Sequence, residues 1–405
     1  MKILLVTDIP PCRNYTAGLV LDMLCRFLPA ESIACCAIMN KEINDAILPP
    51  DLAKTMPFKR IDKPQEFWPK PIDFKSHFVS FLGEMKNEQY IKNYMLDEIA
   101  GFASRFGVDK IWFVIQGQTE IYLARPLARM LGKPFVVQIW DPLYFWMDAH
   151  NVDKFTQKKL MREFACILRD SDGFFAASWN MAEDYSRRYS VRSIPFVACL
   201  EKELAVKPVT AVGNSDTIRI AGNGKVYPVE MWTSLCEALD LVDWKICGKK
   251  VILRVMSNNI TPIKKWEFHI ENPGWLSQEE TVKKLSECDI MYCPYWLDPY
   301  YAEVARMSFP GKMATFAAAG RPILFHGPED ASPAKFLSDN EAGLICNSYE
   351  PDHIIDAITT IIRDKVLYSK LARNAGKVFE KFLTKDSLKK NFAEFLRNDI
   401  RALNQ

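Results

Sequence analysis

The sequence has no long apolar run. The first run, in MKILLVTDIPP, spans four residues before Thr7 and Asp8, which is too short for a signal-peptide core and is typical of a first strand. No later stretch approaches the ~20 apolar residues that a helix needs to cross a bilayer. We therefore expect a cytoplasmic protein, with peripheral contact at the cytoplasmic face of the membrane as the alternative.

An excess of one charge is also lacking, as is any regular cysteine pattern. Lysine and arginine number 52 against 50 acidic residues, so the net charge of +2 provides no global field to attract nucleic acid. The eleven cysteines are scattered, mostly in apolar runs such as the one containing Cys35 and Cys36, without metal-ligand spacing. Buried reduced thiols, no bound metal and no other cofactor are the expectation.

What is present is the composition of an ordinary globular protein, with 49% hydrophobic and 25% charged residues. A chain of 405 residues is too long for one core, so two domains are predicted. Strand and helix patterns alternate throughout, which favours an α/β fold with mostly parallel sheets. The expected division is an N-terminal domain over 1–200, a linker over 201–216, a C-terminal domain over 217–384 and a final helix over 385–405 that packs back on the N-terminal domain.

Apolar periodicity places the individual elements. The predicted strands are Lys2 to Thr7, Ile33 to Met39, Lys110 to Ile115, Pro134 to Ile139, Gly173 to Ala177, Ile194 to Cys199, Thr217 to Ala221, Trp244 to Cys247, Trp266 to Ile270 and Asp289 to Cys293. The predicted helices include Leu19 to Leu28, Gln118 to Met130, Lys154 to Leu168, Val229 to Leu241 and Gln278 to Glu287, with three more that begin near Asp352, Leu367 and Lys385. Ser277 and Glu280 have the spacing of a capping box.

Two loops of the C-terminal half have the composition of phosphate sites. In the first, Gly222, Asn223 and Gly224 follow a strand and precede Lys225, so backbone amides and a cation can approach a phosphate. The alternative is an ordinary tight turn. In the second, Ser308-Phe309-Pro310-Gly311-Lys312 opens an alanine-rich helix that Gly320 ends, and free amides at a helix start favour anions. The alternative is a solvated lysine on a surface helix.

The loop from Tyr295 to Glu303 is aromatic and polar. Ring faces and a carboxylate suit a sugar, because its C–H faces stack on rings and its hydroxyls need acceptors. Ordinary packing of the rings is the alternative, so of this loop only Glu303 is predicted to contact the donor.

These segments resemble the retaining, nucleotide-sugar-dependent glycosyltransferases of the GT-B fold. The resemblance runs through Gly274-Trp275-Leu276, Cys288 to Pro294, FPGKMATFAAAGRPIL and HGPEDASPAKFLSDNEAGLIC, and more loosely through Thr16-Ala17-Gly18 and Gln138 to Asp141. It implies two Rossmann-like doubly wound domains facing across a cleft, a backbone contact from Leu276 to the base, and amides at Ser308 to Lys312 that hold the diphosphate. The donor-binding residues predicted on this basis are Gly18, Gly222, Asn223, Gly224, Trp275, Leu276, Glu303, Ser308, Phe309, Pro310, Gly311 and Thr315.

The sequence departs from the resembled group at two positions. Members commonly carry two glutamates eight positions apart, and here those positions are Met307 and Thr315. The identity of the donor sugar is therefore not inherited from the resemblance.

Catalysis is expected to depend on fixed cations and amides that stabilise the departing diphosphate, with Lys225, Lys312 and the amides around Gly18, Gly224 and Gly311 as candidates. No carboxylate pair has the spacing of glycosidase chemistry, so front-face retaining transfer without a metal is expected, as the resemblance implies. Asp141 is the alternative: a general base there would indicate inversion, whereas capping of the next helix would make it structural. His150 is a weaker candidate for an acceptor contact.

The stretch from Lys54 to Phe78 interleaves basic and aromatic residues, which suits an anionic membrane surface. Five prolines there favour the alternative of a solvated insertion.

The predicted function is transfer of a hexose-type sugar from a nucleotide-diphosphate donor to a glycan or lipid-linked acceptor, in bacterial cell-surface polysaccharide or glycolipid synthesis. An inactive nucleotide-sugar-binding module and a nucleotide-sugar epimerase are the alternatives. A dehydrogenase is disfavoured because no G-x-G-x-x-G follows the first strand.

Overall fold

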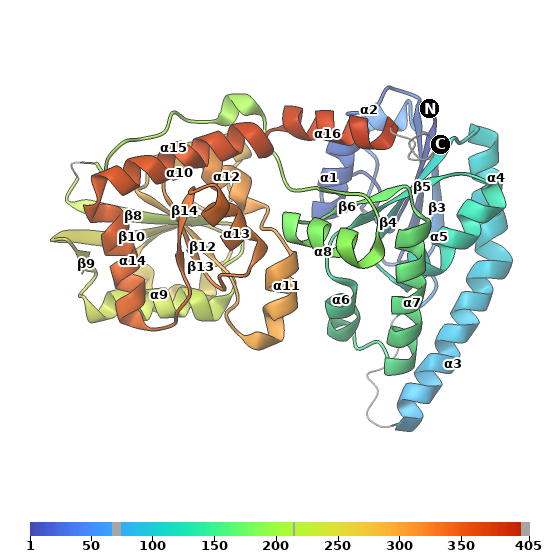
Figure 1. The fold of residues 1–405 in the computed structure, drawn as a ribbon, viewed down its shortest axis with the longest axis horizontal. Coiled ribbons are helices and arrows are strands. Elements are labelled where there is room, and N and C mark those ends of the chain that lie inside the picture. The colour runs from blue at the N-terminus through green and yellow to red at the C-terminus, as the bar shows by residue number, and fades with distance from the viewer. Residues whose placement is uncertain (67–73, 214, 398–405) are drawn as a thin grey trace. The chain divides into compact units, whose positions relative to one another are not determined.

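The computed structural model describes residues 1–66, 74–213 and 215–397. Within these ranges the chain forms two units, an N-terminal unit (Met1–Phe196 with Asn391–Gln405) and a C-terminal unit (Val197–Lys390). Each unit contains one twisted sheet flanked by helices (Figure 1). Residues 67–73 of the predicted basic and aromatic stretch lie outside the described residues.

The sheet of the N-terminal unit is parallel throughout, in the order β3-β2-β1-β4-β5-β6-β7. Its inner strand β1 pairs Leu5 with Cys35 on one side and with Trp112 on the other. Helices cover both faces of such a sheet, which explains why its inner strands are continuous apolar runs. The strands are β1 (Ile3–Thr7), β2 (Ile33–Met39), β3 (Phe58–Asp62), β4 (Lys110–Ile115), β5 (Phe135–Ile139), β6 (Gly173–Ala176) and β7 (Ser193–Pro195).

The helices of this unit connect successive strands. Among them, α5 begins after Gly117 and ends at Gly132, whose φ of 60° is the left-handed conformation that glycine adopts without strain. The helices are α1 (Thr16–Cys25), α2 (Pro50–Ala53), α3 (Phe74–Tyr90), the π-helix η1 (Ile91–Met95), α4 (Leu96–Phe106), α5 (Gln118–Leu131), α6 (Leu143–Ala149), α7 (Lys154–Asp170) and α8 (Trp179–Tyr189).

The sheet of the C-terminal unit has the order β11-β10-β8-β12-β13-β14, parallel except for β9, which pairs antiparallel with β10. Its strands are β8 (Thr217–Asn223), β9 (Lys245–Ile246), β10 (Lys249–Met256), β11 (Ile270–Glu271), β12 (Ile290–Pro294), β13 (Ile323–His326) and β14 (Gly343–Cys346). The helical elements are η2 (Lys202–Leu204), α9 (Val229–Leu241), η3 (Thr261–His269), α10 (Gln278–Ser286), η4 (Pro299–Tyr301), α11 (Ala302–Met307), α12 (Lys312–Ala318), α13 (Ser332–Asp339), α14 (Pro351–Arg363), α15 (Lys365–Phe382) and α16 (Lys385–Arg397).

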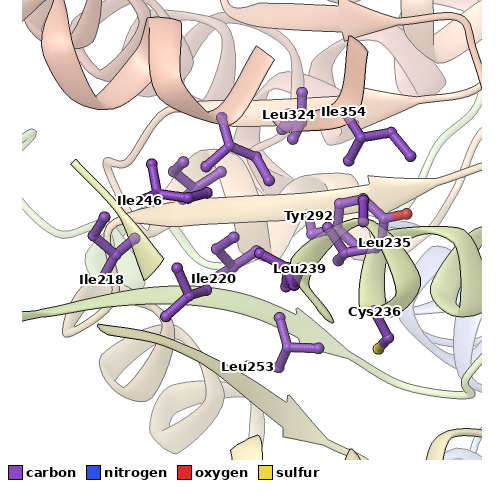
Figure 2. Packing of buried hydrophobic residues seen from close by; sticks show 14 of the residues in the cluster. Ile218, Ile220, Leu235, Cys236, Leu239, Ile246, Leu253, Tyr292, Leu324 and Ile354 are labelled. Carbon is purple, nitrogen blue, oxygen red and sulfur yellow. The ribbon is translucent and has the colours of Figure 1, made fainter. Parts of the chain in front are cut away.

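The core of the C-terminal unit lies between its sheet and the helices α9 and α14. Ile220 of β8 and Leu253 of β10 pack with Leu239 of α9 and Ile354 of α14, and all four are buried (Figure 2). Removing this apolar surface from water is the main force that fixes the sheet and so the loops at its edge.

Several predictions of elements are confirmed in detail. Ser277 forms the expected capping box, because its hydroxyl accepts from Glu280 N at 3.2 Å and its own N–H donates to Glu280 Oε2 at 3.0 Å. The helix over Val229–Leu241 and the strand over Ile33–Met39 have the predicted bounds.

Two strand predictions are wrong. The stretch Trp266 to Ile270 mostly belongs to the 3-10 helix η3, and only Ile270–Glu271 forms a strand. Trp266 is held there by its indole N–H, which donates to Asp240 Oδ2 at 2.7 Å. The strand predicted over Ile194 to Cys199 ends at Pro195, where its partner strand β6 also ends at Ala176.

The segment expected as a linker, 201–216, is part of the C-terminal unit. Val206 N donates to Ala318 O at 2.8 Å and Val209 N to Gly320 O at 3.2 Å, so this segment is bonded along the end of α12. A Cβ on Gly320 would meet Val206 O at 2.8 Å, which explains why a glycine ends that helix.

The last helix, α16, begins in the C-terminal unit and its residues from Asn391 onward belong to the N-terminal unit. There Phe392 is buried, with ring centroids 5.4 Å from Trp112 and 5.2 Å from Phe175. This end of the chain therefore completes the core of the N-terminal unit.

Replacement Phe392→Ala is expected to destabilise the N-terminal unit by about 3–5 kcal/mol, because it removes a buried ring and leaves a cavity. Thermal unfolding followed by circular dichroism should show the loss. The exposed neighbour Lys390→Ala serves as the control and should be neutral. Equal stability of the two variants would contradict the assigned packing.

Candidate functional site

The candidate site lies where the strand order of the C-terminal sheet reverses. From β8 the chain passes through α9 to β10 on one side, whereas β12, β13 and β14 continue on the other side. Loops after the carboxyl ends of such neighbouring strands diverge and leave a crevice where ligands bind in doubly wound sheets. The loops at this point follow Asn223 of β8 and Pro294 of β12.

Two of the predicted phosphate-binding segments meet at this point. Asn223, at the end of β8, donates through Nδ2 to Thr315 Oγ1 of α12 at 3.3 Å. The Thr315 hydroxyl in turn donates to Lys312 O at 2.7 Å. Asn223 Oδ1 is buried and has no hydrogen-bond partner among the described residues, so it is an acceptor without a donor.

Lys312 forms a second link between the same segments. Its ammonium lies over the ring of Tyr227, 5.3 Å from the centroid, and Tyr227 belongs to the loop after β8. Desolvation lowers the pKa of Lys312 from its ordinary value. A cation held against an aromatic face in a partly dehydrated position interacts strongly with an incoming anion.

The start of α12 adds backbone donors. Gly311 is its N-cap residue, and Pro310 O accepts from Met313 N at 3.0 Å, so the turn begins before the helix proper. Amides of a first helical turn have no carbonyl partner within the helix. The amides of Gly311 and Lys312 therefore lack a carbonyl partner within α12.

Aromatic side chains border this position. The rings of Tyr227 and Trp296 are 5.6 Å apart, and Trp296 stacks on Tyr301 at 5.3 Å. Tyr295, after β12, forms a 3.0 Å hydrogen bond with Ser308 Oγ. The predicted aromatic loop thus packs together and also supports the segment that leads into α12.

Gly222 and Gly224, the glycines of the first loop, each have a role in the packing or backbone geometry of the fold. A Cβ on Gly222 would lie 2.7 Å from the Trp232 ring, so this glycine permits Trp232 to pack against β8. Gly224 has a φ of 82°, and its N–H donates to Met256 O at 3.0 Å. The Gly224 amide is thus used by the fold, whereas Lys225 next to it is exposed.

The other predicted donor residues lie on three further elements. Trp275 is exposed and Leu276 half-buried, after Gly274, which has a φ of 80°. Glu303 lies in the first turn of α11, half-buried. Phe309 packs edge-on against Phe336 at 5.2 Å.

The two positions where the sequence departs from the resembled group differ in the structure. Met307 is fully buried in α11, whereas Thr315 bonds Asn223 at the site. The threonine position is therefore the one of the two whose side chain borders the candidate site.

In the N-terminal unit, Gly18 lies against its own chain. A Cβ there would be 2.2 Å from Cys12 Sγ, and Gly18 O accepts from Cys12 N at 3.2 Å. The loop after β1 therefore packs against Gly18 more closely than a larger residue would permit.

Asp141 follows β5 and is exposed, and desolvation raises the pKa of its carboxyl. It does not cap α6, whose N-cap residue is Pro142 and which has no side-chain cap. The role of Asp141 as a general base stays a prediction. His150 instead bonds Trp146 O through Nδ1 at 2.8 Å.

A buried charged cluster in the N-terminal unit escaped the sequence analysis. Lys63 Nζ lies 3.0 Å from both Glu66 Oε2 and Glu120 Oε1. Glu66 also accepts from Thr119 N at 2.7 Å and so caps α5, whose own N-cap Gly117 supplies no side chain. Burial raises the pKa of Glu120 to about 8, against the lowering effect of Lys63. Glu120 is 57 residues from Lys63 in sequence, and the sheet that contains β3 and β4 brings α5 to the segment after β3.

Solved structures resemble this chain over nearly its whole length. HepE from Anabaena in complex with UDP has a TM-score of 0.65 and 13% identity, covering 98% of this chain and 99% of that chain. Sucrose-phosphate synthase from Thermosynechococcus elongatus gives a TM-score of 0.65 and 11% identity, covering 98% of both chains. The chain has the GT-B fold.

The lipopolysaccharide outer core galactosyltransferase WaaB is a further structure with the GT-B fold, at a TM-score of 0.62 and 14% identity, covering 98% of this chain and 99% of that chain. No protein-family model and no curated relative matches the sequence. The identities are low, so these likenesses establish the fold, and the site has to be argued from its own residues.

Two features are absent from residues 1–66, 74–213 and 215–397. No group of three or more His, Cys, Asp or Glu side chains suited to a metal ion occurs among them. In the same ranges, no helix combines the length and apolar character needed to cross a membrane.

A buried histidine underlies the site. His326, at the end of β13, has Nδ1 2.7 Å from the Tyr292 hydroxyl and Nε2 2.7 Å from Ser348 O. Desolvation lowers the pKa of His326 to about 4, against the raising effect of the Ser348 carbonyl. The backbone carbonyl of His326 also accepts from Tyr295 N at 2.7 Å, so the end of β13 holds the start of the aromatic loop.

This histidine predicts a loss of stability in acid. Because its pKa is lower in the folded protein than the ordinary 6.5, the unfolded chain binds the proton more readily as the pH falls below 6.5. Unfolding free energy should decrease by about 3 kcal/mol between pH 7 and pH 4 through this group alone. Denaturant unfolding of the protein and of His326→Gln at both pH values measures it, and an equal pH dependence in the variant would contradict the assignment.

Proposed function

We propose that the protein is a glycosyltransferase whose C-terminal unit binds a nucleotide-diphosphate sugar and transfers a hexose-type sugar to a glycan or lipid-linked acceptor. Retention of configuration is the favoured outcome, and bacterial cell-surface polysaccharide or glycolipid synthesis is the proposed setting. The GT-B fold is compatible with this activity but does not by itself assign it.

One observation carries the proposal. The loop after β8 and the start of α12, predicted separately as phosphate sites, are joined by the Asn223–Thr315 hydrogen bond and by Lys312 over Tyr227. Their junction lies at the switch point of the sheet and presents a cation, first-turn amides and an unpaired amide oxygen. This set of groups suits a diphosphate with an attached polyhydroxylated moiety.

The chemistry assigned to these groups is stabilisation of a leaving group. When the bond between the sugar C1 and the diphosphate oxygen breaks, negative charge grows on the diphosphate, and the Lys312 ammonium and the amides of α12 stabilise it. The acceptor oxygen forms the new bond to C1, and its proton leaves with the diphosphate in the retaining path. In the inverting alternative, Asp141 accepts this proton, which its raised pKa favours.

The choice of donor for testing follows from the similar structures. HepE was solved in complex with UDP and with UDP-glucose. UDP and UDP-glucose are therefore the first ligands to test on this chain, followed by other nucleotide sugars. Metal independence stays an expectation. An assay of activity in the presence of a chelator would test it.

Replacement Lys312→Ala is expected to weaken binding of UDP-glucose about tenfold to a hundredfold, because a charge-assisted contact to the diphosphate is lost. A thermal-shift titration measures it, since a ligand that binds only the folded state raises the melting temperature. Lys335→Ala, an exposed lysine of α13 in the same unit, is the matched control and should bind normally. An unchanged shift in Lys312→Ala would place the phosphates elsewhere.

Product analysis separates the alternatives. Release of UDP with the sugar attached to an acceptor supports transfer, whereas binding without turnover with any acceptor would indicate an inactive module. Conversion of the nucleotide sugar to its epimer without acceptor would indicate the epimerase.

A further inference from the structure

The stretch from Lys54 to Phe78 contains basic residues that suggested membrane contact. Several of them form contacts within the N-terminal unit. Lys59 pairs with Glu98 at 2.8 Å, and Arg60 donates to Ile43 O at 2.9 Å. Lys63 is buried in the charged cluster with Glu66 and Glu120. These side chains are therefore engaged within the protein rather than free to meet a lipid surface.

The helix that follows has an exposed apolar face instead. On α3, Phe78 is 48% exposed, Val79 65%, Leu82 43% and Met85 46%. Positions 78, 82 and 85 recur at helical spacing, so these side chains share one face of the helix, which lies along the N-terminal unit (Figure 1). We call Phe78, Val79, Leu82 and Met85 the α3 face.

The exposed charges within this helix are basic. Lys86, adjacent to Met85, is exposed, whereas Glu84 is buried. Glu88 is turned inward, where it bonds Lys159 of α7 and Lys92. Over 77–93 the described carboxylates thus lie away from the surface that carries the apolar side chains.

The first turn of α7 extends this surface. Phe155 is 41% exposed, and its ring lies 5.8 Å from Phe81 of α3. Lys158, in the same turn, is exposed, and Lys154 is exposed but pairs with Asp148 at 3.5 Å. Apolar side chains bordered by lysines therefore come from two packed helices.

Tyrosines continue the surface toward the far end of the helix. Tyr90 and Tyr94 are exposed, with ring centroids 5.4 Å apart. Tyrosine favours the boundary between water and hydrocarbon, because the ring is apolar and the hydroxyl is hydrated.

We infer that the α3 face, with Phe155, docks on the surface of an anionic lipid bilayer. Apolar side chains inserted at the headgroup boundary with lysines beside them bind anionic lipids through both burial and charge. A second copy of the same face would place lysines of the two copies together, so charge favours the lipid surface. The inference is independent of the proposed transferase activity, because vesicle binding is measured without donor or acceptor.

Flotation of the full chain with vesicles tests it. The protein should float with vesicles of phosphatidylcholine and phosphatidylglycerol, less with phosphatidylcholine alone, and less at high salt. Leu82→Glu/Met85→Glu should reduce co-flotation about tenfold or more, since two apolar contacts are lost. Lys86→Glu should reduce it about fivefold on anionic vesicles only.

The matched control is Leu241→Glu/Val366→Glu, which places the same charges at exposed apolar positions of the C-terminal unit and should float like the unaltered protein. Circular dichroism and melting temperature verify that each variant is folded. Protein that stays in the soluble fraction with anionic vesicles overturns the inference, as does equal flotation of the α3 and control variants. A dimer in analytical ultracentrifugation that Leu82→Glu/Met85→Glu dissolves also overturns it, because the face would then bind a second copy.

Discussion

The link between the end of β8 and the start of α12 is the constraint on which the candidate site depends. The Asn223–Thr315 hydrogen bond and the Lys312–Tyr227 contact join two segments that are about ninety residues apart in sequence. Neither contact is strong alone, but the core beneath them fixes both segments, so little conformational entropy is lost when a ligand binds. In the proposed function, the Lys312 cation and the first-turn amides of α12 would stabilise charge that develops on the leaving group.

The same structure shows why small residues around the site are needed. Gly222 makes room for Trp232, Gly320 for the backbone of Val206, and Gly327 for Tyr295, whose Cβ would be 2.7 Å from an added Cβ. Each of these glycines permits close packing within the fold, and the contact of Gly222 with the donor stays a prediction. The same packing holds in place the side chains that we propose for ligand binding, Lys312 and Thr315.

The two units place ionisable groups differently at their sheet edges. In the C-terminal unit, Lys312 is partly dehydrated, which suits an anionic ligand. In the N-terminal unit, Lys63 lies 3.0 Å from both Glu66 and Glu120, so that cluster is internally paired and fastens the segment after β3 to α5. A buried pair of this kind defines geometry more than it adds stability.

The sequence by itself determined what depends on local patterns. Alternating strands and helices, the capping box of Ser277 and Glu280, and the glycine and lysine loops at 222–225 and 308–312 are encoded by neighbouring residues, so they were predictable. Tertiary structure alone decided which loops meet, and it buries Met307 while Thr315 borders the site. It also decided that Trp266 bonds Asp240 instead of joining the predicted strand, and that α3 exposes an apolar face. These outcomes depend on strand order and on contacts between distant residues, and no local period carries that information.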